Sequence, residues 1–222
     1  MKLPQNPFIR FAMAAWLAAP FAQAQLTWDQ NGTSTGQPNG AGSWLGTNLW
    51  WNGSTNQDWV AGSNAIFGGP NTAGGAVTLA SAISVGSITF NTFTGTYTLG
   101  SPGQALTING GINKTSTAAA VSLTASPITL GAAQTWTNNS SGAFSITVPV
   151  NNGGNLLTLD GNGTTNFGTA TTSVISGAGG ITYNGTGRLF LGAGQVPAHT
   201  YTGTTTLNGG VTMVSNNNLG PG

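Results

Sequence analysis

Charge is what this 222-residue chain most conspicuously lacks: only 3% of its residues are charged, and glutamate is absent. Since an average soluble domain carries about 25% charged residues, the composition excludes a charge-rich helical bundle, a coiled coil and a charge-driven disordered tail. Binding a phosphate backbone requires clustered Lys and Arg, so nucleic acid is not an expected partner. The four basic residues are instead scattered along the chain: Lys2, Arg10, Lys114 and Arg188.

Cysteine is also absent, so the fold must be held by packing and backbone hydrogen bonds alone. The chain starts with a basic segment, an apolar stretch over 11–21 and the tripeptide Ala22-Gln23-Ala24. These are the parts of a secretory signal peptide with its cleavage site. We therefore predict a signal peptide over 1–24, cleaved between Ala24 and Gln25. The apolar stretch falls short of the roughly 20 residues that a membrane helix needs, so no membrane span is expected.

Glycine, threonine and asparagine are abundant instead, with 36, 34 and 23 residues. Residues 25–70 are rich in tryptophan between turn signals, whereas residues 71–222 consist of short runs in which apolar and hydroxyl side chains alternate. Alternation with period two is typical of strands, and no helical periodicity follows residue 25. The predicted strands lie within 76–80, 83–90, 95–100, 104–110, 121–125, 127–131, 143–150, 155–161, 173–177, 180–185, 187–192, 204–209 and 211–215.

Two all-β architectures fit these runs: a sandwich of antiparallel strands and a solenoid of stacked coils. The Asn-Gly turns suit both. Repetition favours the solenoid, because residues 180–192 and 201–216 share a strand, a glycine-containing corner and a second strand. We predict a parallel β-helix with coils of roughly 20 to 25 residues over 71–222 and a Trp-rich N-terminal cap over 25–70. An antiparallel β-sandwich is the alternative.

The segment 175–222 resembles the autotransporter-associated β-strand repeat of large exported bacterial proteins. The resemblance rests on a glycine-rich lead-in over 177–181, a Gly-Thr-Gly corner at 185–187 followed by Leu-Phe-Leu, and the run 201–207. The chain departs from the repeat at Tyr183, at Arg188 and over 195–199.

The resemblance implies a right-handed parallel β-helix of passenger type, exposed at or released from the cell surface and without enzymatic activity. Members of the family usually carry many more repeats and a C-terminal anchor. The resemblance therefore implies that this chain is the N-terminal part of a longer protein, or a truncated reading frame.

Catalytic and metal-binding chemistry has few candidates here. One histidine, His199, and three aspartates are too few ligands for a zinc site, and no Gly-x-Ser-x-Gly motif supports a hydrolase triad. We predict that His199 is a solvated loop residue and that Lys114 and Arg188 stand alone. Asp29 and Asp58 are the one acidic pair that could be neighbours. No catalytic residue, cofactor or metal is predicted.

The tryptophans form the one cluster with the character of a site. Exposed aromatic rings stack on sugars, so a glycan-binding surface is one interpretation. The other, which we favour, is a cap that closes the first coil against water. Adjacent strand residues face opposite sides, so Trp50 and Trp51 are the pair expected to be most exposed. The glycan candidates are Trp44, Trp50, Trp51 and Trp59.

The predicted function is structural: an exported, nearly neutral β-helical surface protein that presents other parts and supports adhesion. Surface glycans and the cell envelope are the candidate partners. A glycan-binding module is the alternative, and a polysaccharide-active enzyme is the third possibility. The segments 204–209 and 211–215 lack charge and proline, so we also expect self-association through the C-terminal coils.

Overall fold

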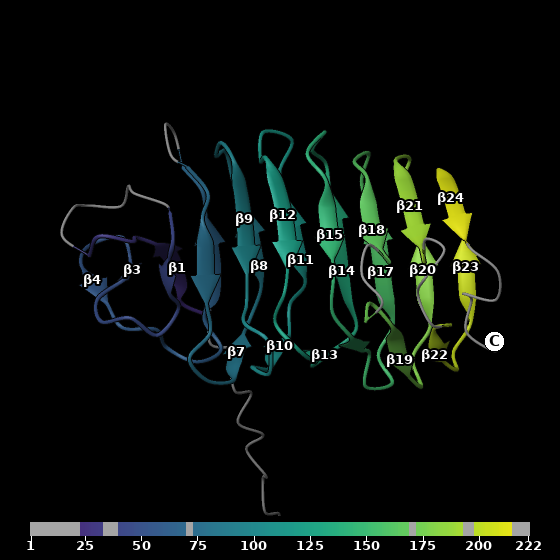
Figure 1. Ribbon diagram of the computed structural model, residues 1–222, viewed down its shortest axis with the longest axis horizontal. Helices are drawn as coiled ribbons and strands as arrows, with labels where there is room; N and C mark the ends of the chain where they lie inside the picture. Colours follow the sequence, from purple (N-terminus) through teal and green to yellow (C-terminus); the bar gives the residue numbers. More distant parts are fainter. Residues whose placement is uncertain (1–22, 33–39, 70–72, 169–171, 193–197, 215–222) are drawn as a thin grey trace, which may run out of the picture.

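The computed structural model describes residues 23–32, 40–69, 73–168, 172–192 and 198–214, which form a row of stacked coils (Figure 1). These residues contain strands, turns and bends but no helix, and hence no helix that could cross a membrane. The strands belong to three sheets, and each coil contributes in turn to each of them. The predicted signal peptide falls on residues 1–22, outside the described part, and on the two residues that follow.

The first sheet has ten strands, and the other two have six and eight. The first sheet contains β1 (Gln25–Trp28), β3 (Trp50–Trp51), β4 (Asn56–Gln57), β5 (Asn64–Phe67), β8 (Ile88–Phe90), β11 (Ile112–Lys114), β14 (Gln134–Asn138), β17 (Leu157–Asp160), β20 (Ile181–Tyr183) and β23 (Thr205–Leu207). The second contains β7 (Ile83–Val85), β10 (Leu106–Ile108), β13 (Ile128–Leu130), β16 (Val150–Asn151), β19 (Ile175–Gly177) and β22 (Thr200–Tyr201). The third contains β2 (Gly42–Ser43), β6 (Ala76–Thr78), β9 (Thr96–Leu99), β12 (Ala120–Leu123), β15 (Phe144–Ile146), β18 (Thr165–Phe167), β21 (Arg188–Leu191) and β24 (Val211–Val214).

Neighbouring coils pair in parallel, which confirms the solenoid. In the first sheet Ile88 pairs with Ile112, and Ile112 pairs with Trp136, so equivalent positions recur at intervals of about 24 residues. The same parallel pairing runs through the other sheets for about six turns. The antiparallel sandwich is therefore wrong, because a sandwich would require hairpin pairing between consecutive strands.

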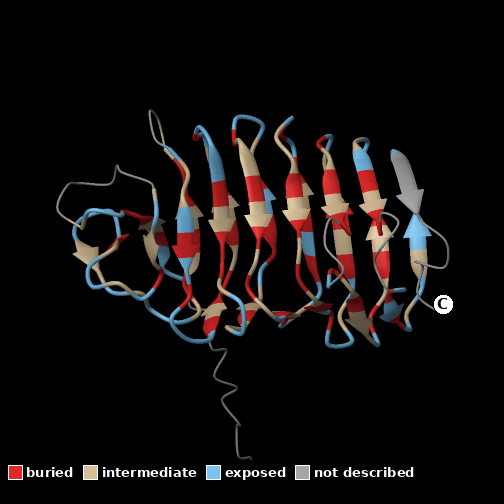
Figure 2. Cartoon of the chain, viewed as in Figure 1, coloured by how far each residue is buried: buried red, intermediate tan, exposed pale blue. Residues whose placement is uncertain are grey.

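Most of the short strands bury alternate residues, and buried positions recur from coil to coil (Figure 2). In β8, Ile88 and Phe90 are buried while Thr89 is half-buried on the outer side. Glycines allow the coils to turn tightly. Gly161 has a positive φ of 104°, and a Cβ there would meet the backbone carbonyl oxygen of Asn138 in the preceding coil. An alanine at this corner would therefore be both strained and obstructed.

The N-terminal end of the solenoid is closed differently. There β1 pairs in parallel with β5, but β3 pairs antiparallel with both β1 and β4, so the first sheet continues beyond the first coil as a small antiparallel extension. Aromatic rings fill the space behind this extension, as the sequence predicted for an N-terminal cap. The exact boundaries at residues 24 and 70 stay predictions.

Candidate functional site

The tryptophan cluster is a packed interior. Trp28, Trp44 and Trp50 are at most 1% exposed, and the indole N–H of Trp50 donates to the carbonyl oxygen of Trp44 at 2.8 Å. The ring centroids of Trp44 and Trp50 lie 4.9 Å apart, and those of Trp50 and Trp59 lie 4.6 Å apart. Trp59 is partly buried against the same core. This arrangement matches a cap that excludes water from the first coil.

The expectation that Trp50 and Trp51 form an exposed pair is wrong for Trp50. The two side chains do face opposite sides, but Trp50 pairs with Trp28 across the antiparallel β1–β3 ladder and points inward. Trp51 is half-buried on the other face. Glycan stacking by these tryptophans stays a prediction, although the rings of Trp44 and Trp50 present no face to solvent in this structure.

The two N-terminal aspartates brace the same cap. Asp29 is fully buried, and its Oδ2 accepts a hydrogen bond from the side-chain amide of Asn56 at 2.8 Å. Asn56 also donates to the backbone oxygen of Asn48, whose own N–H donates to Asp58 Oδ1 at 2.8 Å. Both carboxylates therefore help to hold the loop at Asn48 and Asn56 in place.

Lys114 lies inside the solenoid, where its hydrogen-bond acceptors are neutral oxygens rather than carboxylates. Its side chain is fully buried because Lys114 occupies an inward position of β11, directly opposite Asn138 of β14. The ammonium group donates to three oxygens: the carbonyl of Gly142 at 2.7 Å, the carbonyl of Ala118 at 3.3 Å and Asn138 Oδ1 at 3.3 Å. Burial lowers the pKa of Lys114 to about 8. The lysine ties neighbouring coils together through their corner carbonyls.

His199 is also buried, which corrects its prediction as a solvated loop residue. Its side chain is 2% exposed, and its Nδ1 accepts the backbone N–H of Ile175 from the preceding coil at 3.0 Å. Because Nδ1 is an acceptor, the ring is neutral and its proton resides on Nε2. Nε2 has no hydrogen-bond partner among the described residues. Burial lowers the pKa of His199 to about 4.

Titratable residues do not converge on a catalytic or metal site in the described ranges, where no three His, Cys, Asp or Glu side chains come together. Arg188, on the outer side of the third sheet, places its guanidinium 4.8 Å from the ring centroid of Phe190.

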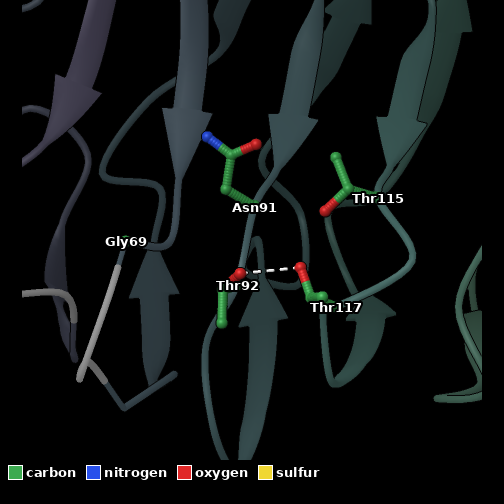
Figure 3. Close-up of a pocket in the computed structure, with 5 residues that line it drawn as sticks. All are labelled: Gly69, Asn91, Thr92, Thr115 and Thr117. Carbon is green, nitrogen blue, oxygen red and sulfur yellow. Dashed lines mark hydrogen bonds between the residues drawn. The ribbon is translucent and has the colours of Figure 1, made fainter.

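An open recess lies instead at the corners that follow β5, β8 and β11. It has a volume of about 470 Å³ and is lined by Gly69, Asn91, Thr92, Thr115 and Thr117. Figure 3 shows the hydroxyl groups of Thr92 and Thr117 facing each other, and their oxygens lie 2.6 Å apart. No sequence motif pointed to this recess. The one signal in the sequence is that threonines at successive corners, Thr92 and Thr117, lie about one coil apart.

A smaller polar hollow of about 180 Å³ lies on the outer face of the first sheet. Its lining includes Thr89, Asn113, Thr135 and Thr137, together with the small corner residues Gly110 and Gly111. It has the same hydroxyl and amide character as the recess. Neither the recess nor this hollow has an ionisable side chain among its described lining residues.

Among known proteins, the chain is similar to "Adhesin BmaC autotransporter" of Brucella suis biovar 1 (strain 1330), with 37% identity over an alignment that covers 43% of this chain. The aligned region is about 3% of the length of that adhesin. No model of a known protein family matches the chain. No solved structure matches it either.

Proposed function

We propose that this chain is an exported β-solenoid of the autotransporter passenger type, which is displayed outside the cell, supports adhesion and has no catalytic activity of its own. The observation that carries the proposal is the similarity to an autotransporter adhesin in a chain that folds as a parallel β-solenoid. The finer assignment, to the autotransporter-associated β-strand repeat, is supported by the order of the motifs over 177–207. These motifs fall on β19, β20, β21, β22 and β23.

The exterior of the solenoid suits a surface role. Outward side chains form ladders in which one hydroxyl or amide group follows another at the strand spacing of about 4.8 Å. Such an uncharged surface remains hydrated while offering many weak hydrogen-bonding groups to a partner. The ladder of the second sheet consists of Ser84, Thr107, Thr129, Asn151, Ser176 and Thr200.

The start of the fold is compatible with removal of a signal peptide after Ala24. Gln25 is the first residue of β1 and pairs with Asn64, while the carbonyl oxygen of Ala24 accepts the N–H of Asn64 at 2.8 Å. Cleavage would therefore leave the residues of β1 in place, but it would remove the Ala24 carbonyl, so the N–H of Asn64 would exchange this acceptor for water. Export and surface location both belong to the proposal.

The test displays the chain on a non-adherent bacterial host through a fused outer-membrane anchor. A matched control carries Leu157→Asp, which buries a charge in the core and should prevent folding without shortening the chain. We expect cells that display the native chain to attach to cultured epithelial cells more than the control or the anchor alone, and protease treatment of intact cells to abolish the difference. Equal attachment with a protease-accessible native chain would overturn the proposal.

A further inference from the structure

We propose that the recess formed by Gly69, Asn91, Thr92, Thr115 and Thr117 binds a neutral pyranose unit of a glycan. This inference rests on the proposed adhesive function and gives that function a ligand class and a place. It also moves the candidate glycan site away from the tryptophan cluster, whose rings Trp44 and Trp50 are buried.

The recess has the size and setting of a ligand site. Its volume of about 470 Å³ lies within the range of roughly 300 to 1,000 Å³ that is usual for small-molecule sites. Three successive corners build it, so the rigid ladder of β5, β8 and β11 fixes the positions of its walls. Backbone hydrogen bonds reinforce the corners: Gly69 donates to Thr92, and Thr115 donates to Phe90.

The polar side chains of the lining have capacity left for a ligand. In the Thr92–Thr117 pair one hydroxyl donates to the other, which leaves one O–H donor and several lone pairs free. The hydroxyl of Thr115 donates to the carbonyl oxygen of Phe90 at 3.0 Å, so it can accept a hydrogen bond from a ligand. Asn91 contributes a carboxamide to the wall (Figure 3), with both donor and acceptor atoms. Alternating donors and acceptors fit the hydroxyl groups of a sugar.

Charge decides between neutral and ionic glycans. None of the five lining residues is ionisable, so a sulfate or carboxylate would lose hydration without gaining an ion pair. None of these five residues carries an aromatic ring for stacking. We therefore expect a weak single-site affinity, with a dissociation constant on the order of 1 mM, which repeated sugars and many displayed copies would strengthen by avidity.

The test is an NMR titration of the ¹⁵N-labelled chain with maltotetraose, chitotetraose and a heparin tetrasaccharide. The variant Thr92→Val/Thr117→Val removes both members of the hydroxyl pair, so neither is left unpaired and the fold should be retained. Thr129→Val is the matched control, because Thr129 lies on the outer face of the second sheet. Thermal unfolding of all three proteins verifies that each is folded.

We expect a neutral tetrasaccharide to shift the amide signals of Asn91, Thr92 and Thr117, with binding weakened about tenfold in the double variant and unchanged in Thr129→Val. No shift with either neutral sugar, or shifts that persist in the double variant, would overturn the inference. Equal binding of heparin at these residues would overturn its neutral specificity. If cells that display the chain adhere but the recess does not bind sugar, this inference fails and the proposed function stands. If the recess binds sugar but the cells do not adhere, the proposed adhesive function fails.

Discussion

We predict that acid lowers the free energy of unfolding of the last coils, because His199 is buried there. The unprotonated Nδ1 of His199 accepts a hydrogen bond from the N–H of Ile175 in the preceding coil. The contact between these two coils therefore depends on a neutral imidazole. Protonation would turn the acceptor into a donor that faces another donor. Both ring nitrogens would then be donors in a site where His199 is 2% exposed.

The pKa of His199 is lowered from 6.5 to about 4 by burial. Between these values the unfolded chain binds the proton more readily than the folded chain, so the free energy of unfolding falls as the pH falls through this window. Above pH 6.5 the histidine's contribution is fully present; by about pH 4 it is lost. At about 1.4 kcal/mol per pKa unit, the loss is roughly 3 kcal/mol.

The assay compares the native chain with His199→Gln, whose amide oxygen can still accept a hydrogen bond but does not titrate. Urea unfolding between pH 7 and pH 4 gives the stability, and hydrogen exchange at the Ile175 amide reports on the bond itself. We expect the native chain to lose about 3 kcal/mol more than the variant on acidification, with earlier loss of Ile175 protection. The same pH dependence in both proteins would refute the reasoning, because the shared aspartates would then account for all of it.

Three further predictions concern the core, the cap and the C-terminal coils. Replacing Lys114 by Met should lower the free energy of unfolding by about 3 kcal/mol in urea, since three oxygens lose their donor. The native chain should gain stability from pH 8 to 9.5, because the folded pKa of Lys114, about 8, lies below its ordinary 10.5; a flat profile would contradict this. Trp44→Ala should lower the free energy of unfolding by about 3 to 5 kcal/mol, whereas Trp51→Ala should lower it clearly less, because Trp51 is only half-buried. Similar losses in the two variants would contradict the assignment of the tryptophan cluster as a buried cap. We further propose that the protein spanning residues 25–222 self-associates through its C-terminal coils, where Leu207 is 45% exposed. The double variant Thr204→Lys/Thr212→Lys should suppress this association in sedimentation experiments; a monomeric native protein at high concentration would contradict the proposal.

Two strands that the sequence did not predict have polar residues at inward positions, where a strand pattern requires apolar ones. β14 (Gln134–Asn138) was missed because Gln134 and Asn138 point inward, so the apolar alternation is broken by buried polar residues. β11 was missed for the same reason at Lys114. The 24-residue spacing from Ile88 through Ile112 would have located both strands, because stacking position rather than local alternation defines a coil.

The candidate sites depend on contacts between coils, which no single segment displays. The burial of His199 follows from its stacking on the preceding coil, and the sequence around it reads as a loop. The recess likewise joins corners that are about 24 residues apart, with Thr92 and Thr117 meeting only after the coils stack. By contrast, the aromatic cap was predictable, because a cluster of large rings at one end of a repetitive chain must be buried somewhere.

Whether this solenoid supports adhesion is best tested by attachment of the producing organism. The measurement counts cells bound to epithelial monolayers for the native strain, a deletion strain and deletion strains complemented with the native chain or with Leu157→Asp. We expect deletion to lower attachment and only the native chain to restore it. If the chain is exposed on intact native cells and its deletion leaves attachment unchanged, the proposed adhesive function is wrong.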